Sequence, residues 1–456
     1  MKSIGKFLPA AMLSFLFLSP LSAFEAGMQA LISGGAAGNG GGRYATYDTW
    51  ECEDDDTFLF GKLLEPGWWS AHHLFTGKLV GWFDMPFIED GSFGLAGQGS
   101  LKYSQESSHD EYPGISFIAD IDLLRYYYNS IDANGSFVLS GGRFNVTDKT
   151  STIINQKIDG LYVGFNGSHV QFGAYAGYTG LLNSKTTLMI NSSGKNYWRA
   201  LYSNSLYNIY RARMKEDRNT SLYVSEIGEQ IFTWADPYVV SSANLTFPYL
   251  FANQTPYIEG IVAIGTEGPS KIEDVFDRFY LTCGMYGPFI YSDFVYNIST
   301  TFSTCGDGAS NKSSSFNGLS NLSKLNVTYF TNFHSLALSG GLTYASGYNG
   351  IYAPFYGFTS TPISYMRFSP EHSAAIKYGL SMSFKPIKEF LITLGGDQLF
   401  SYEENIVEFE GWQWYTEIKL QCTSDFQFQV KAYRFNAEKG PYYDNTGATV
   451  TAVFSF

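Results

Sequence analysis

The chain has 456 residues, of which 18% are aromatic and 16% charged, and its formal net charge is −13. Such an aromatic-rich chain is not disordered, and its acidity argues against a nucleic-acid partner, because binding phosphates needs a basic surface. The four cysteines, which suit neither a zinc site nor a disulfide framework, are Cys52, Cys283, Cys305 and Cys422. We expect no metal and no cofactor.

The first residues predict a secretory signal peptide. Lys2 and Lys6 flank the start of a short apolar run, and Ala23 supplies the small residue expected before a cleavage site. The run is too short for a membrane-spanning anchor and contains prolines. We expect cleavage of residues 1–23, which leaves 27 of the 29 basic residues against 42 acidic ones, a net charge near −15.

In the mature chain, residues 24–456, alternation of apolar and polar residues is the dominant pattern and becomes clearer toward the C-terminus, as in β-strands with two different faces. In the segment 412–422, for example, Trp412, Trp414 and Ile418 share one face, while Glu417 and Lys419 share the other. The predicted strands are 25–32, 71–82, 92–103, 114–127, 135–146, 157–166, 168–180, 237–248, 255–266, 276–286, 289–303, 322–332, 334–345, 373–384, 390–401, 411–422, 425–436 and 447–456.

These segments are about ten residues long, and tight turns alternate with long connections. The tight turns lie at Asn134-Gly135, Asn166-Gly167, Gly287-Pro288, 385–388 and 423–425. The long connections are 33–70, 181–236, 304–321 and 346–372. This pattern predicts an all-β fold, a transmembrane antiparallel up-and-down β-barrel of about 18 strands (16 would also fit), with short periplasmic turns and long external loops.

Aromatic residues gather where the strands meet the tight turns, among them Trp82, Phe83 and Phe426, and predict a girdle at the membrane–water boundary. At the end of the chain, Val450, Ala452, Phe454 and Phe456 share one face. This ending resembles the terminal strand of bacterial outer-membrane barrels, which implies recognition of the strand ending at Phe456 by the barrel-insertion machinery.

Two motifs add a narrower resemblance. The sequence Gly141-Gly142-Arg143-Phe144, followed by Gln156-Lys157-Ile158-Asp159-Gly160-Leu161, resembles a hairpin of the alginate-export-type porins, and Ala345-Ser346-Gly347-Tyr348 is similar to another of their strand-to-loop signatures. The resemblance implies an 18-stranded barrel with a polar lumen. The strongly basic pore of that family is not matched here, because the lumen-facing charges are mixed in sign.

If the aromatic face meets lipid, the other face lines a hydrated lumen, since so many ionised groups cannot stay dry. The candidate pore-lining residues are Asp120, Asp122, Arg143, Glu259, Arg278, Asp293, Lys377, Glu417, Lys419, Gln427, Gln429 and Lys431. Glu417, Lys419 and Lys431 are also placed to pair across neighbouring strands.

The connection 181–236 is basic in an otherwise acidic protein. One hypothesis is that it folds into the barrel and narrows the pore; the alternative is an external loop that binds anionic lipid head groups or nothing. The residues of this candidate constriction loop are Lys195, Arg199, Arg211, Arg213, Lys215 and Arg218.

The sequence therefore predicts a porin of the bacterial outer membrane, a channel for passive diffusion of small hydrophilic solutes, charged ones included. No catalytic motif such as His-Glu-x-x-His or Gly-x-Ser-x-Gly occurs, so we expect no enzyme. The expected partners are outer-membrane lipid and small solutes, and a homotrimer is an assembly common among porins. Two alternatives stay open: a hydrophobic-substrate transporter of the fatty-acid type, and an adhesin anchored by the barrel.

Overall fold

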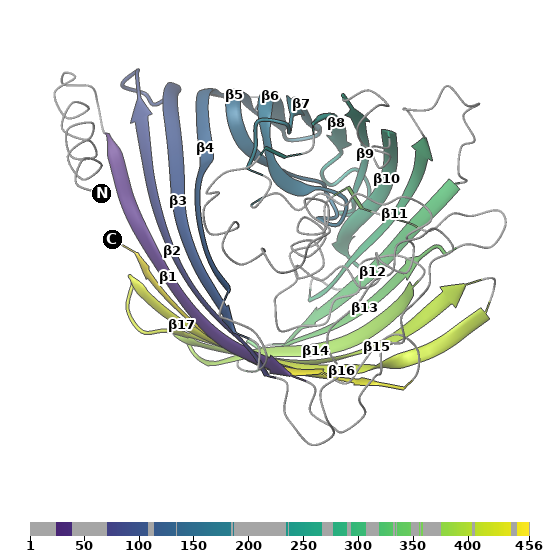
Figure 1. The fold of residues 1–456 in the computed structure, drawn as a ribbon. Helices are drawn as coiled ribbons and strands as arrows, with labels where there is room; N and C mark the ends of the chain where they lie inside the picture. The colour runs from purple at the N-terminus through teal and green to yellow at the C-terminus, as the bar shows by residue number, and fades with distance from the viewer. Residues whose placement is uncertain are drawn as a thin grey trace, which may run out of the picture.

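A computed structural model shows one closed antiparallel barrel of 18 strands. It describes residues 24–38, 71–107, 114–133, 135–183, 186, 234–235, 237–266, 277–289, 293–306, 319–331, 333, 335–347, 355, 357–358, 375–403, 406–438 and 445–455. Each strand pairs with its neighbours in the sequence, and β1 pairs with both β2 and β18 (Figure 1). Closure pairs the first strand with the last, so neither is left as a free edge in the bilayer.

All 18 predicted strands are present, most of them longer than the alternation alone indicated. Their bounds are β1 Glu25–Gly38, β2 Ala71–Pro86, β3 Phe93–Ser107, β4 Gly114–Asp132, β5 Gly135–Thr147, β6 Asn155–Gly167, β7 Gln171–Tyr178, β8 Tyr238–Thr246, β9 Thr255–Gly265, β10 Asp277–Pro288, β11 Phe294–Gly306, β12 Leu319–Phe330, β13 Ala337–Ala345, β14 Ala375–Ile387, β15 Phe390–Glu403, β16 Ile406–Gln421, β17 Phe426–Ala437 and β18 Asn445–Ser455.

The strand register sorts side chains onto two faces, because directly paired residues of neighbouring strands point the same way. On β18, Val450 and Phe454 point outward and pair with Val430 and Phe426 of β17. Large exposed apolar side chains continue this outer surface around the barrel, for example Leu79, Leu101, Ile258, Phe302 and Trp414. The outer surface is thus an apolar belt.

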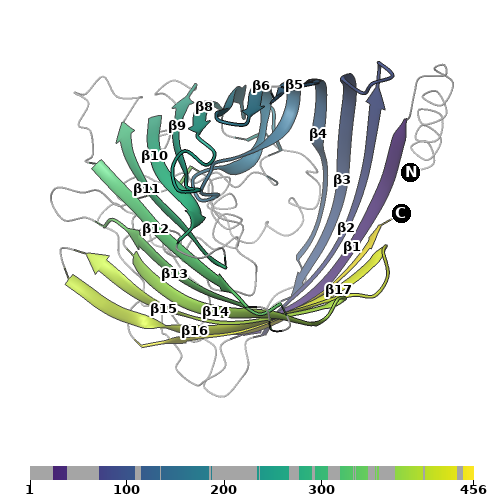
Figure 2. The ribbon, with the colours of Figure 1, turned by 180° about the vertical axis from the view of Figure 1, so that it is seen from behind.

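The two ends of the barrel differ in their connections (Figure 2). At the end that holds the start of β1 and the end of β18, the connections are short, such as the two residues 388–389 between β14 and β15. The longest connections, 39–70, 179–237 and 346–374, all lie at the other end. In the part of the chain that the structure describes, no helix is long and apolar enough to span a membrane.

Some of the predicted turns lie wholly or partly within strands: Asn166-Gly167 in β6, 385–387 in β14 and Gly287-Pro288 in β10. Gly287 and Pro288 belong to β10, and the turn to β11 follows them, because the pairing of β10 with β11 continues to Pro288 and Val295. Asp293 consequently lies in this turn and is exposed, rather than on the wall of the barrel.

Candidate functional site

The hairpin of β5 and β6 leaves the barrel wall before it ends. The two strands pair with each other as far as Thr147 and Asn155. On one side, β4 pairs with β5 only up to Leu124 and Arg143, although β4 itself continues to Gly114. On the other side, β7 pairs with β6 only up to Asp159. The last turn of the hairpin, residues 144–158, therefore has no backbone neighbour in the wall (Figure 1).

Two glycines mark the line where the hairpin departs. Gly142 has a φ of 126°, and a Cβ there would lie 2.3 Å from the backbone oxygen of Leu124. Its partner in register, Gly160, would place a Cβ 2.0 Å from the backbone oxygen of Ala176. Any larger residue at either position would collide with a flanking strand, so glycine permits the close approach at the bend.

One face of the departing hairpin end is apolar and packs inside the barrel. Phe144, Val146 and Ile158 join Ile153 and Ile154 of the connecting segment in one buried cluster. The cluster also contains inward side chains of six wall strands and two residues of the connection between β13 and β14, namely Tyr175, Tyr238, Val240, Ile261, Ala263, Tyr280, Leu322, Ala345, Phe355 and Phe358. Part of the barrel interior is thus filled, and the open lumen is narrowed.

The tip of the hairpin, residues 148–154, is fixed by buried carboxylates. The Asp148 side chain accepts hydrogen bonds from the backbone N–H groups of Ile153 and Ile154 at 2.8 and 2.9 Å. Glu259 on β9 accepts one from the backbone N–H of Lys149 at 2.8 Å. The Phe358 N–H donates to the Ile153 carbonyl, which joins the tip to the connection after β13. These bonds hold the tip in one place.

The other face of the hairpin end is charged and meets the inner face of β4. Lys157 Nζ lies 2.5 Å from an Asp120 carboxylate oxygen and 2.6 Å from one of Asp122. The Arg143 guanidinium makes a two-pronged contact with Asp159, each bond 2.8 Å long, and lies 3.9 Å from Asp120. The Asp120 side chain is only 2% exposed. Where backbone pairing between β4 and β5 stops, ion pairs take its place.

A segment that follows β7 covers this ion cluster. The Leu181 carbonyl accepts a hydrogen bond from Arg143, Asn183 Nδ2 donates to the Ala119 carbonyl of β4, and the Thr186 hydroxyl donates to Asp120. The segment thus connects the end of β7 to β4 across the position that the hairpin vacates. It supplies polar partners to β4, whose edge is otherwise unpaired there.

Elsewhere the inner wall is regular and carries ion pairs between adjacent strands. Lys377 on β14 lies 3.5 Å from Asp397 on β15. Glu417 on β16 lies 2.9 Å from Lys419 and 3.8 Å from Lys431, so the pairing expected for these three residues is present, and Gln429 donates a further hydrogen bond to Glu417.

Two sites on the inner wall bring lysines together. Lys78 and Lys102 are direct neighbours on β2 and β3. Lys324 on β12 and Lys377 on β14 flank Thr343 of β13. Among the described residues, no carboxylate lies within ion-pairing distance of Lys102 or Lys324. Directly opposed like charges destabilise a sheet, and the lysines at these positions give the adjacent lumen a positive potential that attracts anions.

The structure brings only some of the candidate pore-lining residues to the open lumen. Asp120, Asp122, Lys377, Glu417, Lys419, Gln427, Gln429 and Lys431 lie on the inner face. Glu259 and Arg278 also point inward, but they are buried: they hold the backbone of Lys149 and Gly357 and do not line water. Arg143 lies on the charged face of the hairpin, and Asp293 lies in a turn.

The candidate constriction loop lies outside the described residues, so its role stays a prediction for Lys195, Arg199, Arg211, Arg213, Lys215 and Arg218. A different segment, the hairpin end 144–158, narrows the interior. Sequence reasoning did not assign roles to Lys102, Lys324 and Asp397, although the same alternation rule places them on the inner face of their strands. Lys157 and Asp159 were missed for another reason. They lie on the face of the hairpin opposite Ile158, and only the inward bend of the hairpin brings that face to β4.

Solved structures with a similar fold include three proteins of Pseudomonas aeruginosa. OccK5 (OpdH) has a TM-score of 0.56 at 10% identity, over 96% of this chain and 98% of that chain. OccK7 (OpdD) has a TM-score of 0.55 at 10% identity, over 96% and 99%. The outer membrane protein opdK has a TM-score of 0.51 at 8% identity, over 95% and 99%. At such identities the likeness concerns the fold. No protein-family model and no curated protein matches the chain.

Proposed function

We propose that this protein is an outer-membrane channel through which small hydrophilic solutes diffuse passively. One observation carries the proposal: a closed 18-stranded barrel turns an apolar belt outward and charged, half-exposed side chains inward. A lipid-facing outer surface and a hydrated lumen explain both faces, because ionised groups tolerate a water-filled pore and not a dry core. The barrel of the Pseudomonas outer-membrane proteins supports the same location.

The hairpin end 144–158 sets the width of this channel. Its apolar face occupies one side of the interior, and its charged face is fixed to β4 by the ion cluster of Asp120, Asp122, Arg143, Lys157 and Asp159. A solute passes through the remaining space, where excluded size and wall charge decide permeation. Lys102 and Lys324, which form no ion pair among the described residues, favour small anions over small cations.

The first observation against a fatty-acid type of transporter is the start of the barrel. β1, Glu25–Gly38, pairs with β2 and β18, so this segment forms part of the barrel wall and not a plug. The inner wall carries too many ionised groups to suit a hydrophobic substrate. Recognition by the insertion machinery through Phe456, a homotrimer and the narrower likeness to alginate-export-type porins remain predictions from sequence.

Liposome swelling tests the proposed function. Purified protein in liposomes should admit small sugars and amino acids, and the swelling rate should fall steeply as the solute grows. In planar bilayers the same protein should give discrete conductance steps. Liposomes that remain impermeable to all of these solutes, with the protein shown by heat-modifiable migration to be folded, would contradict a diffusion pore.

A further inference from the structure

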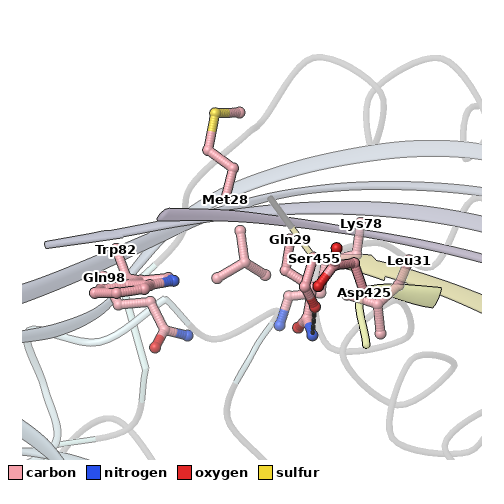
Figure 3. Close-up of a pocket in the computed structure, with 9 residues that line it drawn as sticks. Met28, Gln29, Leu31, Lys78, Trp82, Gln98, Asp425 and Ser455 are labelled. Atoms are coloured by element: carbon pink, nitrogen blue, oxygen red, sulfur yellow. Dashed lines mark hydrogen bonds between the residues drawn. The ribbon is translucent and has the colours of Figure 1, made fainter. Parts of the chain in front are cut away.

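A cavity of about 490 Å³ lies in the wall where the barrel closes, between β18, β1, β2 and β3 (Figure 3). The residues that carry the argument are Gln29, Lys78, Trp82, Gln98, Asp425 and Ser455. In Figure 3 they project to one side of the strands, and Met28 projects to the other. The register agrees, because Gln29 pairs with Ser455 and Trp82 pairs with Gln98. The cavity therefore opens on the lumen.

Trp82 is an exposed aromatic residue on the inner face of the barrel. The sequence predicts it in the aromatic girdle, yet the register places it on the inner face, and it is 41% exposed. Its indole lies flat over Gly27, where a Cβ would come within 2.6 Å of the ring. Because Gly27 has no side chain, one face of the indole packs against the backbone of β1, and the rest of the ring is exposed. An indole held open to a water-filled pore is costly without a partner.

Polar groups surround this open ring. The Gln98 carboxamide lies beside Trp82 in Figure 3, and Gln29 donates a hydrogen bond to the Ser455 hydroxyl at 3.3 Å, which leaves its carbonyl oxygen as an acceptor. Lys78 and Asp425 contribute one charge of each sign. The nearest carboxylate to Lys78 outside the cavity is Asp122, at 4.0 Å. The lining of the cavity is therefore rich in donors and acceptors and carries one charge of each sign, and Lys102, which pairs with Lys78, is not part of it.

We propose that this cavity is a luminal binding site for a neutral pyranose sugar. A sugar ring has an apolar C–H face that can stack on the indole of Trp82, and its hydroxyl groups both donate to and accept from carboxamides. A free anion would gain from Lys78 but meet the carboxylate of Asp425. The cavity volume falls within the range of about 300–1,000 Å³ that small-molecule sites occupy. The site rests on the proposed channel function and gives it a substrate class.

Sugar-induced blockade of the ion current in planar bilayers tests this site. Wild-type channels in potassium chloride should show added current noise and partial blockade as D-glucose or maltose is raised. Trp82→Ala and Gln98→Ala should each raise the sugar concentration needed for half-blockade at least tenfold. Trp82→Phe, which keeps a stacking ring, should change this concentration less than threefold. Trp412→Ala, on the outer face, is the matched control and should match the wild type.

The outcomes separate the site from the channel. Conducting channels whose sugar blockade is absent, or is unchanged in Trp82→Ala and Gln98→Ala, overturn the sugar site and leave the channel function in place. Stronger blockade by gluconate than by glucose, abolished in Lys78→Gln, also overturns it, because the site then binds an anion. Folded protein without any conductance contradicts the channel function itself. Heat-modifiable migration confirms that each variant is folded before its current is measured.

Discussion

The wall from β14 to β18 and the end of the β5–β6 hairpin are held in the same barrel by different kinds of interaction. Between β17 and β18, direct pairing runs without interruption from Phe426 and Phe454 to Phe435 and Asn445. At the hairpin end, pairing to both flanking strands stops at Arg143 and Asp159, and side chains take over. The first region is held by backbone hydrogen bonds, and the second by ion pairs and apolar packing.

The comparison explains why the two regions suit different roles. A continuously paired wall satisfies every backbone group internally, so it stays closed in lipid whatever its side chains do. The hairpin end depends on particular side chains, and a change in any of them can move it. The regular wall therefore encloses the pore, and the hairpin end sets its width.

The largest effect is expected at the bend. Gly160→Ala would place a Cβ 2.0 Å from the Ala176 carbonyl oxygen, and relieving the clash requires a shift of β7. We expect the free energy of unfolding to fall by about 3 kcal/mol or more. This would appear as less folded protein in outer-membrane fractions and a lower unfolding temperature in detergent. The control is Gly260→Ala, where an added Cβ meets no atom within 4 Å. Equal stability of the two variants would contradict the role of the bend.

Loss of the ion cluster comes next. Asp120→Asn together with Asp122→Asn leaves Lys157 half-buried without a counter-ion, and breaking such a pair costs about 3–5 kcal/mol. We expect larger and noisier single-channel currents, because the hairpin end is released from β4. The matched control is Asp397→Asn, which breaks the Lys377 pair in the regular wall. If the control changes the current as much as the double variant does, the cluster has no special role in holding the hairpin.

A smaller effect is expected at the hairpin tip. Glu259→Ala removes the acceptor for the Lys149 N–H, and an unsatisfied buried donor costs about 1–3 kcal/mol. The tip should loosen, and single-channel conductance should rise with little change in the unfolding temperature. Gln427→Ala, on the inner face of the regular wall, should keep the wild-type conductance. An unchanged current in Glu259→Ala would mean that packing alone holds the tip.

The smallest effect concerns ion selectivity. Lys324→Gln removes a cation that forms no ion pair among the described residues, and a unit charge at 4 Å is worth about 1 kcal/mol in water. Reversal potentials in a salt gradient should show the anion-to-cation permeability ratio falling severalfold, with conductance nearly unchanged. Lys388→Gln, in the turn between β14 and β15, should leave the ratio alone. A ratio that does not respond to Lys324→Gln contradicts the assigned anion preference.

The strands could be predicted because each is a local pattern. Two-residue periodicity and turn residues located all 18, and the pairing of Glu417 with Lys419 on the same face of β16 and with Lys431 on the adjacent β17 followed from the same alternation. Misplaced Asp293 shows the limit at strand ends, where one residue decides between wall and turn. Trp82 shows another limit, since its hydrophobicity suggested the lipid face and its register put it in the lumen.

By itself, the sequence determined an all-β chain with one apolar and one polar face on each strand, because these properties depend on residues close together in the chain. Only the tertiary structure decided which part of the chain enters the barrel. The hairpin bends inward because Gly142 of β5 and Gly160 of β6 are paired at the bend. It stays there because Lys157 forms ion pairs with carboxylates on β4. Contacts between residues so far apart in the sequence produce no local periodicity from which they could be predicted.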